Sequence, residues 1–298
     1  EHLHQFRLLI LNIINHSNYN VLTTKNLFGL FLALLFLLKS TVTNSCTIFM
    51  ANDGHQVWIG NNEDELAATK YRFWFYPTQR NHYGYTIWTE LSFGRLLNGF
   101  SYLNPQGGLN EFGLFLDFTS IDPITVNKDQ SKKDRKKQIA TDLLKKCKSV
   151  DEALAYLTTF NLVKLSKAQM FIGDASGNYA VVTGGYIVRK TTNNFVLTNY
   201  PVNLGYTVPC HRRDAANHSL QSVTNIDLQR MKIILAQSAQ YAPNNLISNY
   251  SMAVNLKTCT IHLYYKNDFT KEATLTLQDE LKKGKHHRNL ADYFLKSI

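Results

Sequence analysis

Short apolar runs in this chain alternate with polar positions or are bounded by turn residues, which is the pattern of β-strands. Several runs come in pairs joined by a short turn, as in "CTIFMAN" and "HQVWIGNNED" around "NDG". Asn, Asp and Gly favour the backbone conformations of tight turns, so such pairs predict β-hairpins. Strand pairs, or a glycine turn followed by a strand, are expected over residues 46–64, 71–91, 107–121, 168–185, 186–202 and 251–267.

Two further segments carry the helical spacing of apolar residues. The first, residues 137–160, is broken near Ser149, which is suited to cap a second helix because Glu152 follows three residues later. The second is residues 225–240. Strand pairs mixed with helices, with no internal repeat and no proline-rich linker, predict a single α+β domain built in layers.

An apolar run near the start of the sequence is interpreted as a targeting segment, outside the fold. Lys25 precedes the run Leu27–Leu38, and a short polar stretch then leads to Cys46. This order is typical of a secretory signal peptide, and the run is too short to span a bilayer comfortably. Thr43 and Ser45 are small enough for positions −3 and −1 of a cleavage site. Cleavage there would make Cys46 the new N-terminus.

The expected organisation is a leader and signal peptide over residues 1–45 and a single domain over residues 46–298. The protein is then secreted or lumenal (extracellular, periplasmic or lysosomal, depending on the host), with no stable membrane span after cleavage. A signal anchor that is never cut remains an alternative. A lipoprotein cysteine is disfavoured because Thr43 stands where that motif has Leu. Asn217 and Asn249 begin sequons that would be glycosylated in a eukaryotic host.

Composition and charge narrow the class of protein. The hydrophobic fraction of 44% supplies a core, and the net charge is +10. Much of that charge lies over Lys128–Lys148, where Asp129, Asp134 and Asp142 are interleaved with the basic residues. A mixed run of this kind is typical of a solvated helix face, so no nucleic-acid partner is expected.

The cysteines do not form a metal motif. Their spacing fits no zinc pattern and no histidines cluster with them, so no metal is expected. Cys147, Cys210 and Cys259 allow at most one intramolecular disulfide, and the sequence does not choose the pair. Cys46 is a separate case because it follows the signal-like segment.

An N-terminal cysteine carries its thiol and a free α-amine on one residue. In unperturbed peptides the amine titrates near ~8 and the thiol near ~8.5. The amine can therefore take the thiol proton near neutral pH without a histidine, which makes Cys46 a candidate nucleophile with its own base. The alternative is that Cys46 is a small, buried apolar residue.

Several motifs in this order resemble one enzyme group. They are "CTIF" at Cys46, "GNNED" at Gly60–Asp64, "GGLNEFGL" at Gly107–Leu114, "VLTNYPV" at Val196–Val202 and the tail "TCTIHLYYKNDFTKEATLTL". The sequence resembles the N-terminal-nucleophile (Ntn) amide hydrolases of the choloylglycine hydrolase, penicillin V acylase and linear-amide C–N hydrolase group. The resemblance implies an α+β fold with a four-layer αββα sandwich, and catalysis without metal or organic cofactor.

The resemblance also implies residue roles. Cys46 matches the nucleophile, and Asp64 matches an aspartate that hydrogen-bonds the N-terminal residue. Asn199 and Asn110 match donors of the oxyanion hole, where neutral amide groups suit a developing negative charge. Asp64, Asn110 and Asn199 each have the alternative of being turn residues at strand ends.

An arginine near the nucleophile matches Arg212 or Arg213 in "CHRRDAA", with Arg212 fitting the spacing better. Either could instead be a surface charge. The group often has Arg where this sequence has Asn61, a departure that weakens a bile-salt assignment. The resemblance therefore implies hydrolysis of a linear amide in a small N-acyl substrate through a thioester. An acyltransferase, or a catalytically silent secreted binding protein if the signal is not cut, remain alternatives, and neither the substrate nor the oligomeric state is indicated.

Overall fold

The computed structural model describes residues 46–91, 105–135, 139–204, 208–221, 225–241 and 245–295. The expected signal peptide, with Thr43 and Ser45, lies outside these residues. Within the described ranges, no helix combines the length and the apolar character that crossing a membrane requires.

The fold is organised around two antiparallel sheets, one of six strands and one of eight. The six-stranded sheet has the order β12 (Phe195–Leu197), β1 (Thr47–Asn52), β2 (Val57–Leu66), β13 (Leu246–Asn255), β14 (Thr260–Tyr265), β15 (Asp268–Thr276). The eight-stranded sheet has the order β11 (Ile187–Arg189), β10 (Tyr179–Val182), β9 (Ala168–Gly173), β6 (Phe115–Ser120), β5 (Gly107–Asn110), β4 (Tyr85–Glu90), β3 (Tyr71–Tyr76), β16 (His286–Asn289). A small parallel pair joins β7 (Lys133–Asp134) to β8 (Phe160–Asn161).

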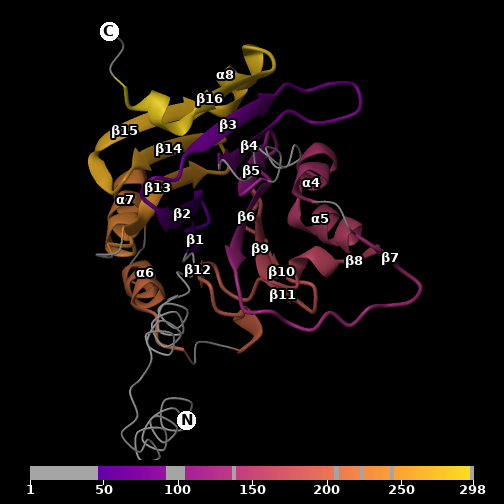
Figure 1. Ribbon diagram of the computed structural model, residues 1–298. Helices are drawn as coiled ribbons and strands as arrows, with labels where there is room; N and C mark the ends of the chain where they lie inside the picture. The colour runs from indigo at the N-terminus through magenta and orange to yellow at the C-terminus, as the bar shows by residue number, and fades with distance from the viewer. Residues whose placement is uncertain are drawn as a thin grey trace, which may run out of the picture. The chain divides into compact units, whose positions relative to one another are not determined.

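Helices cover the outer face of each sheet (Figure 1), whereas the helix Leu277–Lys282 packs Leu277 and Leu281 into the core between the sheets. The described α-helices are α4 (Ala140–Lys146), α5 (Val150–Leu157), α6 (His211–Gln221), α7 (Leu228–Gln237) and α8 (Leu277–Lys282). The 3₁₀ turns are η2 (Val163–Leu165), η3 (Val202–Leu204) and η4 (Leu290–Tyr293).

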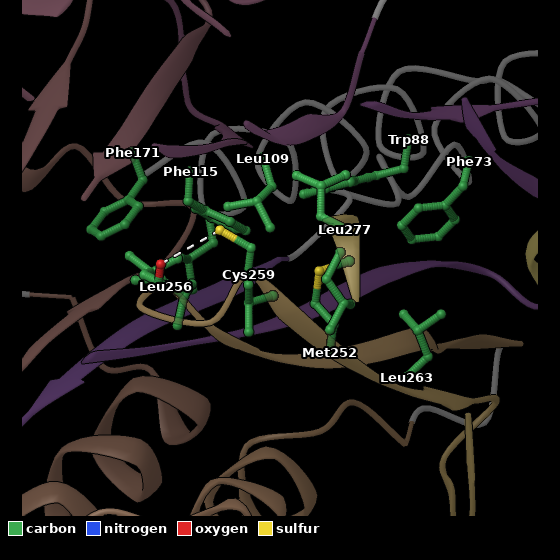
Figure 2. Close-up of a cluster of buried hydrophobic side chains, with 14 of the residues drawn as sticks. Phe73, Trp88, Leu109, Phe115, Phe171, Met252, Leu256, Cys259, Leu263 and Leu277 are labelled. Atoms are coloured by element: carbon green, nitrogen blue, oxygen red, sulfur yellow. Dashed lines mark hydrogen bonds between the residues drawn. The ribbon is translucent and has the colours of Figure 1, made fainter. Parts of the chain in front are cut away.

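Three hydrophobic clusters show that the domain has four layers. One cluster draws buried side chains from both sheets and fills the space between them, as Figure 2 shows for Phe115 and Met252. A second joins the eight-stranded sheet to α4 and α5, and a third joins the six-stranded sheet to α6 and α7. The order helix, sheet, sheet, helix confirms the predicted α+β class and the αββα sandwich.

The hairpin of β1 and β2 depends on one glycine. Gly60 lies opposite Phe49 in the register of the two strands. A Cβ atom at Gly60 would come within 2.1 Å of the Phe49 ring, so the ring occupies the place of a side chain. The "GNNED" segment therefore begins with glycine for a packing reason.

The helical segment around Ser149 folds as predicted. α4 ends at Lys146, and the Ser149 hydroxyl then accepts a hydrogen bond from the Glu152 backbone N–H to cap α5. This cap satisfies one of the free N–H groups at the helix start.

Three parts of the fold differ from the sequence-based expectation. Residues 186–202 do not form a hairpin, because β11 pairs with β10 in one sheet while β12 pairs with β1 in the other. Gly107–Asn110, expected as a glycine turn, is itself the strand β5. The turn follows this strand and joins β5 to β6. The helix α6, which carries the two candidate arginines, was not expected.

The remaining sequence-based expectations concern covalent modification. All four cysteines are free, so no disulfide forms among Cys147, Cys210 and Cys259. Asn249 is fully buried in β13 and donates its side-chain amide to the carbonyl of Leu66. Its sequon is therefore closed to glycosylation in the folded protein, which corrects that expectation.

Candidate active site

Cys46 lies at the start of β1, buried between two neighbouring strands. The side chain is 6% exposed. Cys46 directly precedes β1, whose registers end with Thr47 opposite Asn62 of β2 and Ile48 opposite Leu197 of β12. Continued in the same direction, these registers place Cys46 opposite Glu63 and opposite Asn199, which lies two residues beyond β12. Residues that lie opposite each other in an antiparallel pair point to the same face, so these three side chains share one face of the sheet.

The alternation of side chains along β1 assigns each group near Cys46 to one face. Ile48, two residues on, belongs to the cluster between the sheets, whereas Phe49 belongs to the cluster with α6 and α7. The thiol of Cys46 therefore faces the interior between the sheets, and Thr47 faces the helices.

On the inter-sheet face, the thiol meets carboxyl groups. Cys46 Sγ lies 3.4 Å from Oε2 of Glu63, which is 5% exposed. Asn61, two residues earlier on the same face of β2, donates from Nδ2 to Oδ2 of Asp117 at 2.7 Å. Asp117 lies on β6 of the opposite sheet and is fully buried, so both sheets contribute an acid to this region.

On the helix face, Asp64 is held by a charged and a neutral partner. Nη1 of Arg212 lies 2.7 Å from Oδ2 of Asp64 and also donates to Oγ1 of Thr47 at 3.1 Å. Ser248 donates to the other oxygen, Oδ1, at 2.5 Å. The register of β2 and β13 shifts between Ser248 and Tyr250, a bulge of the kind that re-aims side chains beside functional sites.

Burial and mutual repulsion keep these acids from ionising at their ordinary pH. Burial raises the pKa of Glu63 to about 8. It raises the pKa of Asp64 to about 7, although Arg212 and Ser248 act to lower it. The pKa of Asp117 is well above its usual range, through burial and then the charge of Glu63. Burial, with the nearby charges of Glu63 and Asp64, also raises the pKa of the Cys46 thiol well above its ordinary value.

Asn199 and its neighbours are held by contacts with the other sheet. Its Nδ2 donates to the carbonyl of Ser120 at 3.0 Å. Nε2 of Gln169 donates to the carbonyl oxygens on either side of Asn199, those of Thr198 at 2.7 Å and Tyr200 at 2.9 Å. The chain at Asn199 is therefore fixed beside Cys46.

Asn110 is not brought to this site. Its Nδ2 donates to the carbonyls of Leu144 at 3.0 Å and Cys147 at 2.7 Å. Its Oδ1 accepts from the backbone N–H groups of Phe112 at 3.1 Å and Leu114 at 3.0 Å. With its amide engaged at the end of α4 and in the β5–β6 turn, Asn110 does not fit the expected role of oxyanion donor. It holds the turn together instead.

The two candidate arginines on α6 have different partners. Arg212 reaches β1 and β2, as described above. Arg213 forms an ion pair with its neighbour Asp214, with Nη2 3.1 Å from Oδ1. The helix α6 lies beside β1 and β12 (Figure 1), and Arg212 is the arginine that faces the start of β1.

The sequence analysis missed three residues of this cluster. Glu63 lies inside a quoted motif but has the same type as many surface acids. Asp117 had a usable signal, because it is a single carboxyl between the apolar residues Leu116 and Phe118 of a strand. Ser248 had none, since its contact with Asp64 joins residues far apart in sequence. In the part of the chain that the structure describes, no group of three or more His, Cys, Asp or Glu residues is arranged to hold a metal ion.

Comparisons with known proteins support the fold. No family model matches the sequence, and a search of curated proteins found no match. Among solved structures, a variant of conjugated bile acid hydrolase from Clostridium perfringens matches with a TM-score of 0.61 and 13% identity, covering 82% of this chain and 96% of that one. Penicillin V acylase from Agrobacterium tumefaciens matches with a TM-score of 0.58 and 15% identity, covering 82% of this chain and 90% of that one.

These likenesses span nearly the whole length of the matched proteins. The αββα sandwich of this chain is therefore the Ntn-hydrolase fold of those enzymes. The resemblance expected from the motifs is confirmed at the level of the fold.

Proposed function

We propose that this protein hydrolyses a linear amide bond in a small N-acyl substrate, with Cys46 as an N-terminal nucleophile. The observation that carries the proposal is the position of Cys46, buried at the start of β1 between Glu63 and Asn199, with Asp64 and Arg212 behind the strand. The matched structures, a bile acid hydrolase and a penicillin V acylase by name, act on amide bonds and favour the same reaction class here.

The nucleophile requires that the peptide bond between Ser45 and Cys46 be hydrolysed first. This cleavage frees the α-amine of Cys46, as expected for a secreted or lumenal protein with a signal peptide. Arg212 then matters for the position of the amine, because it bonds the side chains of both Thr47 and Asp64. Thr47 follows the nucleophile directly, so this contact fixes the backbone that carries the amine.

The reaction follows in two stages. The α-amine takes the proton of the Cys46 thiol, and the thiolate attacks the substrate carbonyl, whose oxygen becomes negative. Asn199 donates its amide to that oxygen, and the α-ammonium gives its proton to the leaving nitrogen as the C–N bond breaks. Water, deprotonated by the same amine, then attacks the thioester and releases the acid.

The substrate remains at the level of an N-acyl amide. Related sequences often have Arg at the position of Asn61, which here bonds Asp117. The inter-sheet face beside the thiol therefore lacks that cation. A substrate with a carboxylate or sulfonate near the scissile bond would meet the carboxyl groups of Glu63 and Asp117 there in place of that cation. We therefore infer a preference for neutral acyl amides.

The test compares the secreted protein with its Cys46→Ala and Cys46→Ser variants on a panel of N-acyl amides. The proposal expects turnover by the parent and none above background by Cys46→Ala. Full turnover by Cys46→Ala would overturn it. Adding primary amines as acceptors and looking for new amides separates hydrolysis from acyl transfer.

A further inference from the structure

The carboxyl group of Glu63 is not used in the mechanism above, although it touches the nucleophile. We propose that Glu63 is a positioning residue for Cys46: its neutral carboxyl donates a hydrogen bond to Sγ as the thiolate forms, and ionisation of that carboxyl switches the nucleophile off. This inference rests on the proposed function and names a regulating group in the same site.

The geometry supports a dedicated contact. The Cys46 thiol donates to Oε2 of Glu63 at 3.4 Å, within the range of hydrogen bonds to sulfur, so the same two atoms lie in reach of each other when the sulfur becomes the acceptor. Thr47 and Asn62, which pair across β1 and β2, directly adjoin Cys46 and Glu63, so the sheet brings the two side chains together. Both side chains are buried, at 5% and 6% exposed, which shields their interaction from solvent.

The groups around Glu63 decide which form of the carboxyl is stable. After burial, the charges of three neighbouring acids raise the pKa of Glu63: Asp64 and Glu65 on β2, and Glu90 at the end of β4. Asp117 on β6 belongs to the same cluster of acids. Burial, and then the charge of Glu63, raises the pKa of the phenols of Tyr71 on β3 and Tyr250 on β13. Arg212 on α6, a cation near these acids, bonds Asp64 and not Glu63 among the described contacts. Burial among acids favours the neutral carboxyl, in line with a pKa of about 8.

A neutral Glu63 resolves a difficulty in the proposed reaction. A thiolate beside an ionised carboxylate is unfavourable in a buried site, because two like charges would lie in contact. With Glu63 protonated, the thiol proton moves to the α-amine, and the Glu63 O–H donates to the sulfur anion. The sulfur attacks the substrate carbonyl as its proton leaves, so no free thiolate persists to take the Glu63 proton, and Glu63 keeps that proton through the acyl-enzyme. An ionised Glu63 would also hold the amine as ammonium and so prevent it from acting as a base.

The experiment follows the thiol directly, apart from turnover. The secreted protein and the Glu63→Gln variant are treated with iodoacetamide from pH 6 to pH 10, and carboxamidomethylation of the Cys46 peptide is timed by mass spectrometry. Gln is neutral at every pH and keeps a donor. We expect Glu63→Gln to react about tenfold faster than the parent at pH 9 and at a similar rate at pH 6. A change of about one unit in the pKa of the thiol changes the thiolate fraction about tenfold. The parent kcat/KM should fall above about pH 8, where Glu63 ionises, and that of Glu63→Gln should not.

Two controls make the result specific. Glu65→Gln removes a neighbouring acid of β2 that lacks the thiol contact, and it should keep the parental profile. Glu63→Leu removes both charge and donor, and it should lower kcat/KM at every pH. If Glu63→Gln fails to fold, the parent profile alone decides, since the inference requires a break near pH 8 in the rate of Cys46 alkylation.

The proposal is overturned if the parent and Glu63→Gln profiles superimpose, or if Glu63→Gln reacts more slowly above pH 8. The latter would mean that an ionised Glu63 supports the site. Either result leaves the hydrolase proposal intact as long as Cys46→Ala is inactive. Turnover by Cys46→Ala would refute the hydrolase proposal whatever Glu63 does.

Discussion

Arg212 and Asp64 form a buried ion pair that joins a helix to the two strands beside Cys46. The Arg212 side chain is 7% exposed and that of Asp64 0%, and their nearest atoms are 2.7 Å apart. Because the same guanidinium bonds Thr47, displacement of α6 would also displace the residue that follows Cys46. The pair is thus a structural support for the site as well as a charge in it.

Breaking this pair should be costly. In Asp64→Asn at pH 8, above the pKa of about 7 at which Asp64 ionises in the folded protein, the buried guanidinium loses its counterion, and a loss of about 3–5 kcal/mol in the free energy of unfolding is expected. Urea denaturation of the two proteins measures it. The exposed pair of Arg189 and Asp151, with side chains 63% and 73% exposed, provides the matched control. Asp151→Asn should cost less than about 1 kcal/mol. Equal losses in the two variants would contradict the assignment.

Stability should fall as pH rises from acid to neutral. The folded-state pKa of Glu63 is about 8 against an ordinary 4.5, and that of Asp64 about 7 against 3.8. Between the ordinary and the folded-state pKa of each group, the native state holds a proton that the unfolded chain has lost, so raising the pH favours unfolding. Each such proton contributes a slope of about 1.4 kcal/mol per pH unit. Urea titrations from pH 4 to pH 9 should show the decline, with a shallower slope in Glu63→Gln. Identical slopes in both proteins would show that Glu63 titrates normally.

Asn199 and Asn110 should respond differently to the same substitution. Asn199→Ala should lower kcat about 10²–10³-fold with little loss of stability, if its amide serves the oxyanion. Asn110→Ala should keep kcat in the folded fraction but lose about 1–3 kcal/mol in stability, because it leaves buried backbone groups unpaired. Steady-state kinetics and urea denaturation on both variants separate the two roles. A fall in kcat for Asn110→Ala alone would reverse the assignment.

Gly60 should not tolerate a side chain. In Gly60→Ala, the added methyl group meets the Phe49 ring, and a loss of about 1–3 kcal/mol is expected from overpacking. The double variant Gly60→Ala with Phe49→Leu should recover part of the loss, because the smaller side chain vacates that space. Denaturation of the single and double variants checks the expectation. An additive, larger loss in the double variant would argue against the contact.

The sequence predicted those parts of the fold that depend on neighbouring residues. The hairpin of β1 and β2 and the cap at Ser149 follow from turn residues and spacing that lie within a few positions. The pairing of β12 with β1 could not be read in this way, because β12 leaves the neighbouring β11 and joins a strand some 150 residues earlier. The position of Asn199 depends on that long-range pairing.

The same limit explains the site residues. Asn110 and Asn199 are equal candidates by residue type, and they differ only in which distant groups their amides contact. Arg212 and Arg213 are adjacent, and the tertiary position of α6 decides which of them reaches Asp64. Glu63 acquires its significance from burial beside a thiol, which no local pattern records.

The central claim is that Cys46 acts with a free α-amine, and the N-terminal residue of the active protein tests it most directly. Intact mass and N-terminal peptide mapping should be carried out on the fraction that turns over an N-acyl amide. The account predicts that this fraction begins at Cys46 and that uncut chain is inactive. Full activity in protein that retains Ser45 before Cys46 would contradict it, because the thiol would then act without an amine of its own.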